Sequence, residues 1–305
     1  MSSIPGVFAA GGVAGCGAVI ASHPFETVKI RMQLQGELRK TSSQTRIYNG
    51  PLHGLKVILR NEGIRGIYSG FGAGSAYQLL LNGSRIGFYE PIRSTLTSLL
   101  YADAKKQSFG INVFSGALSG IIGAVLGSPF FLVKTRMQTY SRVAPMGTQY
   151  VYKSTWDALR RVYRVEGLRG LYRGCDAAIL RTGVGSSAQL PCYYAAKRVL
   201  VERMNMKEGT GLHLVGSSIS GCAVCCLMHP VDTIMARMYN QNGTLYRGIF
   251  DCLTKTVMTE GLLACYKGFL PHLARILPHT VLTLTIAEQA IAVVKTLERK
   301  ETDFL

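Results

Sequence analysis

The sequence has few charges for its length, and few of those charges are acidic. Of its 305 residues 17% are charged, with 17 Asp and Glu against 34 Lys and Arg. A typical soluble domain carries roughly 25% charged residues. The apolar share is 48% and the mean hydropathy is +0.19. This balance argues against two ordinary soluble domains and favours one polytopic membrane domain.

Motifs of enzymes and metal sites are also missing. No nucleophile–base set, metal constellation or phosphate loop appears, so we expect a protein that is not an enzyme and has no cofactor and no metal. The eight cysteines are scattered, and the one CxxC, at Cys222 and Cys225, has no second pair or suitably placed histidines. We interpret the cysteines as small buried hydrophobic residues. The opening MSSIPG has neither a basic region nor a cleavage site, so we expect no cleavable presequence.

The excess of basic residues gives a net charge of +17. A nucleic-acid binder can show such a balance. Here the bases stand between long apolar runs, which favours anionic lipid surfaces and an anionic ligand instead of nucleic acid.

Three sequence blocks recur in one order. The first reads SHPFETVKIRMQ, GSPFFLVKTRMQ and MHPVDTIMARMY, and its prolines are Pro24, Pro129 and Pro230. The second begins with Tyr at IYNG, VYKS and LYRG, and the third reads NEGIRGIYSG, VEGLRGLYRG and TEGLLACYKG. Repeats of this kind predict one supersecondary unit used three times. We predict a single domain over 1–305, built from repeats at 1–105, 106–208 and 209–305.

Each repeat predicts two long apolar helices with a short polar helix between them. Each long helix is near the ~20 residues that cross a bilayer, and the segments lack strand alternation. Six spans in an all-α membrane protein place both termini on one side. The first long helices are expected at 4–34, 110–139 and 212–239, the short ones at 51–60, 154–163 and 247–258, and the second long ones at 72–98, 176–200 and 270–296.

These blocks resemble the signature of the mitochondrial carrier family, which is Pro-x-acid-x-x-base, then acid-Gly, then aromatic-base-Gly. The resemblance covers essentially the whole chain. It implies six tilted helices around a central cavity with pseudo-threefold symmetry, plus three short helices on the matrix side. It also implies a monomeric transporter of the mitochondrial inner membrane that works by alternating access, with both termini toward the intermembrane space.

Finer details resemble the members of this family that carry oxaloacetate. They are LNGSRIGFYEPIR, VFSGALSGIIGAVLGSPFFLVKTR and AAILRTGVGSSAQLP. This implies transport of oxaloacetate, sulfate and malonate-like dianions, by proton symport or by anion exchange. The alternatives are a malate–oxoglutarate type exchanger and a proton-leak, uncoupling-like carrier. Outside transport, an enzyme and a scaffold or receptor on a degenerate carrier fold remain as competing classes.

The resemblance also implies a gate on the matrix side, where the acid of one proline helix pairs with the base of the next. In this sequence Glu26 would pair with Lys134, and Asp232 with Lys29. The third pair is missing, because Phe131 and Met235 stand in its place. We interpret the two changes as one event, since a lone buried charge would be costly. Gln33 and Gln138 match the glutamines that brace such pairs, and Tyr239 stands in the third place.

A second gate, on the cytoplasmic side, is implied by the pattern aromatic-acid-x-x-base in the second long helices. Its residues are Glu90, Arg93, Tyr194, Lys197 and Glu288. Only Lys197–Glu288 is a complete pair, because Arg93 would face Tyr194 and Glu90 would face Ile291. We expect this gate to be weaker than the matrix gate.

Two intramembrane arginines are the strongest candidates for substrate binding. Arg181 and Arg275 each lie 13 residues before the cytoplasmic gate, roughly 20 Å along a helix. Guanidinium groups hold carboxylates through two parallel hydrogen bonds, so the pair suits a dianion. The other candidates, most of them positions that the family uses for substrate, are Arg85, Thr182, Tyr77, Gln78, Asn82 and Gln189.

Two further features follow from the pattern. His279 lies one turn after Arg275 and titrates near neutrality, so it is either a proton carrier or, in our preferred interpretation, a hydrogen-bonded wall residue. Gly70, Gly174 and Gly268 precede the second long helices. Helix starts bind phosphate, and the resemblance implies cardiolipin at these three places.

Overall fold

The computed structural model describes residues 4–38, 47–100, 109–141, 145, 147–204, 210–241 and 245–276, with 282, 286, 289 and 290. These residues form helices and no strand. The first long helix of each repeat is present over nearly the predicted range. The three are α1 (Ile4–Leu34), α5 (Phe109–Thr139) and α8 (Thr210–Asn240), and each has its proline inside.

The second long helices are α7 (Cys175–Met204) and, in the first repeat, the two helices α3 (Phe71–Gly87) and α4 (Tyr89–Leu100). The sequence predicted one helix over 72–98, which is wrong at Phe88. Pro91 explains the break, because it lacks the N–H that would bond to the Gly87 carbonyl and its ring clashes there. In the third repeat residues 269–276 are helical, and most of the range predicted beyond them lies outside the described residues.

The short helices are α2 (Pro51–Ile67), α6 (Thr155–Leu171) and α9 (Ile249–Glu260), the last followed by the 3-10 turn η2 (Leu262–Tyr266). α2 and α6 are longer than predicted because they continue past a kink. The kinks lie at Gly63 and Gly167, both with φ +67°. Only glycine adopts this left-handed region without strain, which explains the glycine of the EG block.

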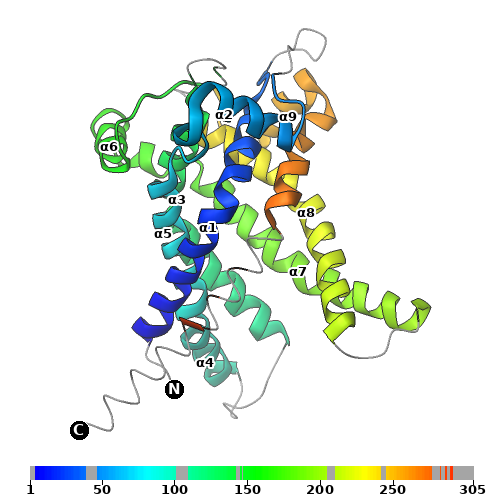
Figure 1. Cartoon of the computed structure of the whole chain (residues 1–305). Helices are drawn as coiled ribbons and strands as arrows, with labels where there is room; N and C mark the ends of the chain where they lie inside the picture. Colours follow the sequence, from blue (N-terminus) through cyan, green and yellow to red (C-terminus); the bar gives the residue numbers. More distant parts are fainter. Residues whose placement is uncertain are drawn as a thin grey trace.

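The long helices pack in chain order, α1 on α3, α3 on α5, α5 on α7 and α7 on α8. The short helices α2, α6 and α9 gather at one end of this bundle (Figure 1). Glycine allows close approach, since a Cβ at Gly123 of α5 would lie 2.9 Å from the Leu81 carbonyl oxygen of α3. Two described segments, Gly110–Thr139 and Ser218–Asn240, are long and apolar enough to span a bilayer by hydropathy.

Candidate functional site

Two buried ion pairs join the proline helices. Lys29 Nζ lies 2.6 Å from Asp232 Oδ2, which links α1 to α8. Lys134 Nζ lies 2.7 Å from Glu26 Oε1, which links α5 to α1. All four side chains are at least nine-tenths buried. The two contacts expected from the sequence are therefore present; that they act as a gate is a prediction.

The third contact, between α5 and α8, is apolar. Phe131 and Met235 belong to the same buried cluster. The Phe131 ring packs between Tyr77 and Tyr239, with ring centroids 4.8 Å and 5.0 Å away. An aromatic stack thus occupies the place where the other two junctions hold an ion pair.

Next to each junction a polar side chain reaches from one proline helix to the next. Gln33 donates to Thr233 Oγ1 (3.3 Å), Gln138 donates to Thr27 Oγ1 (3.2 Å), and the Tyr239 hydroxyl hydrogen-bonds to Ser128 Oγ (2.9 Å). Gln33 and Gln138 therefore brace residues beside Asp232 and Glu26, and Tyr239 takes the corresponding place at the apolar junction.

The sequence analysis missed a set of three fully buried arginines. Each forms two hydrogen bonds with the glutamate of its own EG block, and the pairs are Arg31–Glu62, Arg136–Glu166 and Arg237–Glu260. These pairs tie the end of each proline helix to the short helix that follows. The signal was in the sequence, because KIR, KTR and MAR repeat the arginine at one position.

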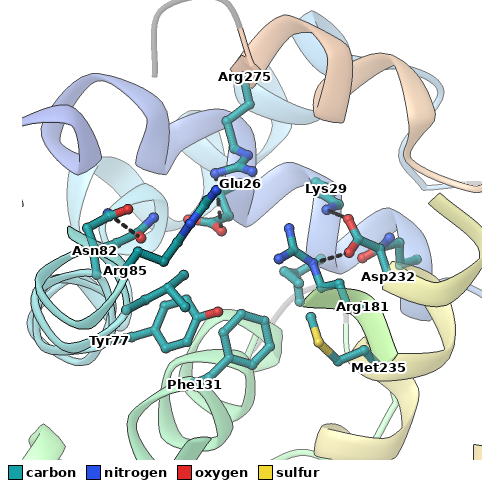
Figure 2. A pocket seen from close by; sticks show the side chains of 14 residues that line it. Glu26, Lys29, Tyr77, Asn82, Arg85, Phe131, Arg181, Asp232, Met235 and Arg275 are labelled. Carbon is teal, nitrogen blue, oxygen red and sulfur yellow. Dashed lines mark hydrogen bonds and ion pairs between the residues drawn. The ribbon is translucent and has the colours of Figure 1, made fainter. Parts of the chain in front are cut away.

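Beside the ion pairs an open cavity lies between the helices. Figure 2 shows Arg85, Arg181 and Arg275 reaching this cavity from three different helices. The predicted residues Tyr77, Gln78 and Asn82 line it too, together with Glu26, Lys29, Phe131, Asp232 and Met235. The structure thus brings most of the candidate substrate residues and the matrix junctions into one space.

The two central arginines contact the same carboxylates as the lysines. Arg181 Nε donates to Asp232 Oδ1, and Arg275 Nη1 lies 3.8 Å from Glu26 Oε1. Asp232 is therefore shared by Lys29 and Arg181, as the dashed lines in Figure 2 show. The sequence analysis treated the arginines and the matrix junctions as separate sites, and the structure corrects this.

The remaining candidates for substrate binding are Thr182, Asn82, His279 and Gln189. The Thr182 hydroxyl donates to the Ala178 carbonyl at 2.9 Å, and Thr182 is not among the residues that line the cavity. Asn82 donates to Gln78 Oε1 at 3.1 Å. His279 and the side chain of Gln189 lie outside the described residues.

The second gate expected from the sequence is less fully described, because Glu288 and Ile291 lie outside the described residues. Arg93 binds Glu90 of its own helix at 2.9 Å. The sequence analysis expected Arg93 to face Tyr194. Tyr194 is 54% exposed, and its contact with Arg93 stays a prediction. The Lys197–Glu288 pair stays a prediction.

The three glycines before the second long helices have φ angles of 72°, 81° and 80° at Gly70, Gly174 and Gly268. All three also lie against the neighbouring proline helix, most closely at Gly268 and Gly70. A Cβ at Gly268 would lie 2.9 Å from the Lys29 carbonyl oxygen, and one at Gly70 would lie 3.0 Å from that of Lys134. Backbone conformation and close approach both require glycine here; their binding of cardiolipin stays a prediction.

Comparison with known proteins adds a family match. The sequence model of the Mitochondrial carrier protein family matches residues 2–99, 105–204 and 207–297. The chain is 59% identical to Mitochondrial citrate transporter E of Aspergillus niger, over 98% of this chain and 96% of the relative. It is 53% identical to the Mitochondrial oxaloacetate transport protein of Saccharomyces cerevisiae, over 97% and 91%. The protein of the same name in Schizosaccharomyces pombe is 52% identical, over 92% and 88%.

Proposed function

The chain belongs to the mitochondrial carrier family, and we propose that it transports oxaloacetate and related small dicarboxylates by alternating access. Members of this family are transporters of the mitochondrial inner membrane and not enzymes. The all-helical architecture agrees with such a carrier. The specific substrate is argued from the cavity.

The observation that carries the proposal is the charge of the cavity. The charged residues lining it are four cations and two carboxylates, namely Lys29, Arg85, Arg181, Arg275, Glu26 and Asp232. This leaves two positive charges, which one dianion neutralises. Guanidinium groups match carboxylates in geometry as well as in charge. A dianion between Arg181 and Arg275 therefore suits the cavity better than a neutral or cationic solute.

Binding of such a dianion would also loosen the protein. Arg181 ties α7 to α8 through Asp232, and Arg275 brings helix 269–276 near α1 through Glu26. Substrate carboxylates compete with the carboxylates of Asp232 and Glu26 for the two guanidinium groups. When the substrate binds both guanidinium groups, the two links between helices are lost, and the helices are freer to move. Substrate binding is coupled to opening in this way.

A second candidate substrate is a tricarboxylate such as citrate. Arg85 lines the cavity, and the described residues show no carboxylate paired with it. A third carboxylate on the substrate would supply that partner. The relative from Aspergillus niger, named as a citrate transporter, supports testing this candidate.

The test is uptake of labelled solutes into proteoliposomes that contain the purified protein. The panel comprises oxaloacetate, malonate, sulfate, malate, 2-oxoglutarate and citrate. We expect oxaloacetate uptake above that of malate and 2-oxoglutarate. Arg85→Gln should lower citrate uptake more than oxaloacetate uptake if the third arginine reads a third carboxylate. Absence of uptake of every anion in the panel would overturn the proposal.

The mode of transport is tested in the same vesicles. A requirement for internal anion indicates exchange, whereas stimulation by an inward proton gradient indicates symport. His279→Gln should remove that stimulation if His279 carries the proton. Proton conductance without any substrate would instead support the uncoupling-like alternative.

The proposal also includes the membrane setting. Both termini would face the intermembrane space, one chain would be the functional unit, and cardiolipin would bind beside Gly70, Gly174 and Gly268. The helix starts that follow Gly70 and Gly174 support the last point, because the N-terminus of a helix attracts phosphate groups. Addition of cardiolipin to delipidated protein should raise its melting temperature.

A further inference from the structure

Side chains of the kinds that bind metal ions cluster around Asp232. The ligand atoms of His229, Asp232 and His272 all lie within 4.8 Å of one another, and the three residues are buried. Cys225 Sγ lies 3.5 Å from His272 Nδ1. We propose that Cys225, His229, Asp232 and His272 form a binding site for a divalent transition-metal ion of the zinc type.

The separations of the other ligand atoms from His272 Nδ1 fit tetrahedral coordination. His229 Nδ1 lies 3.1 Å from His272 Nδ1, which lies 3.5 Å from Asp232 Oδ2. Zinc binds nitrogen and oxygen at about 2.0–2.2 Å and sulfur at about 2.3 Å, which places neighbouring ligand atoms roughly 3.3–3.6 Å apart.

The tautomer of His229 favours a ligand role. His229 Nε2 lies 3.0 Å from the Lys267 carbonyl oxygen. Because a carbonyl oxygen only accepts, Nε2 carries the proton and Nδ1 presents its lone pair to the cluster. A backbone carbonyl that orients a histidine in this way is the usual second partner of a metal ligand.

The first repeat supplies an internal comparison. His23 takes the place of His229 there, with its Nε2 2.9 Å from the Ser69 carbonyl oxygen. The residue at the place of His272 is Gly74, and a Cβ there would lie 3.6 Å from His23 Nδ1. The bundle therefore forms without a second histidine in the first repeat. The paired histidines belong to the third repeat and are not required by the fold.

The charged groups around the site indicate how a bound ion would affect transport. Cys225 as a thiolate and Asp232 would supply two negative charges to a divalent cation, although Asp232 is already shared by Lys29 and Arg181. Lys29 already occupies Asp232 Oδ2 at 2.6 Å, so an ion on that oxygen displaces the lysine. The ion also ties α8 to helix 269–276 through His272. Because alternating access needs these helices to move, the bound ion would inhibit transport. Asp232 lines the cavity, so an ion that enters by this route must pass its net positive charge, and entry is expected to be slow.

The first test is direct binding, which does not depend on the transported solute. Metal-stripped, purified full-length protein is titrated with Co²⁺, and the visible absorption of tetrahedral cobalt with a thiolate ligand is recorded. Zn²⁺ is then used to displace it. We expect one ion per chain. Ala178 is the residue of the second repeat that corresponds to His272, since each lies four residues after the glycine that precedes its helix. His272→Ala therefore introduces a residue that the fold accepts at this position, and it should weaken binding by at least about tenfold.

Matched variants make the result specific. Cys225→Ser should remove the thiolate band, whereas Cys226→Ser, which changes an exposed neighbour, should keep it. His53→Ala changes an exposed histidine on α2 and should also bind normally. If His272→Ala fails to fold, Cys225→Ser carries the test. Absence of the band, or its loss in Cys226→Ser instead of Cys225→Ser, overturns the site.

The second test is inhibition of uptake by micromolar Zn²⁺, reversed by a chelator. Inhibition should disappear in His272→Ala in proportion to its loss of binding. A protein that binds Co²⁺ but transports none of the anions retains the metal site and loses the proposed function, so the two failures are distinguishable. Equal inhibition of the wild-type protein and of His272→Ala contradicts the inhibitory role.

Discussion

The two lysines that link the proline helices, Lys29 and Lys134, should differ in their contribution to stability, although their ion pairs have nearly the same length. When Lys29 is replaced with Met, Asp232 keeps a direct hydrogen bond from Arg181. When Lys134 is replaced with Met, Glu26 keeps only Arg275, 3.8 Å away and beyond hydrogen-bonding distance. Lys134→Met therefore leaves the more poorly compensated buried carboxylate.

The magnitudes follow from these contacts. Losing one hydrogen bond to a charged group costs about 1.5–3 kcal/mol. Leaving a buried charge without its partner costs about 3–5 kcal/mol. The expected difference is about 2 kcal/mol, and in a large domain each kcal/mol shifts the melting temperature by roughly 2 °C. Lys134→Met should therefore melt about 4 °C below Lys29→Met by the same conversion.

The assay is thermal unfolding of both variants in one detergent, with a chelator present so that no metal binds Asp232. The control is Glu26→Gln combined with Lys134→Met, which removes both charges and should melt above Lys134→Met alone. Equal melting temperatures for the two lysine variants, or a lower value for Lys29→Met, would refute the claim that Arg181 supports Asp232 in the resting state.

Two other predictions concern the same end of the bundle. Phe131→Asp combined with Met235→Lys should restore an ion pair at the apolar junction, raise the melting temperature above that of Phe131→Asp alone and slow uptake. Additive effects in a double-mutant cycle would mean that the two residues do not interact. For Glu260, burial opposes ionisation, but the hydrogen bonds from Arg237 outweigh it and hold the pKa below its usual value. A depressed carboxyl pKa stabilises the fold above about pH 4.5 and loses that contribution as the pH falls through the folded pKa. Glu260→Gln should therefore lower the melting temperature at pH 7 and flatten its decline in acid, and unchanged acid sensitivity would contradict this.

Much of the fold could be predicted because the same pattern of helices occurs in all three repeats. The proline helices begin and end within two residues of their predicted limits. The break at Phe88 was missed, although Pro91 marks it, since hydropathy continues smoothly across it. The short helices were predicted to end at residues 60 and 163, before the kinks at Gly63 and Gly167, and their continuation past the kinks was missed.

The contacts of the site were predictable only where the same motif recurs in each repeat. The pairs Glu26–Lys134 and Lys29–Asp232 follow from one motif in successive repeats. The contact of Arg181 with Asp232 depends on how deeply α7 packs against α8, which the sequence does not encode in any local pattern. The proximity of His229 to His272 also depends on helix packing, so the spacing of the cysteines in the sequence does not indicate it.

Uptake of oxaloacetate by protein that lacks both central arginines tests the account most directly. Arg181→Ala and Arg275→Ala should each lower uptake at least about tenfold, because truncating one partner of a buried charge contact costs about 2–5 kcal/mol. The double variant should show no uptake above empty vesicles. Cooperative melting of the detergent-purified double variant establishes that it is folded. Retained uptake by that folded double variant would contradict the claim that Arg181 and Arg275 hold the substrate.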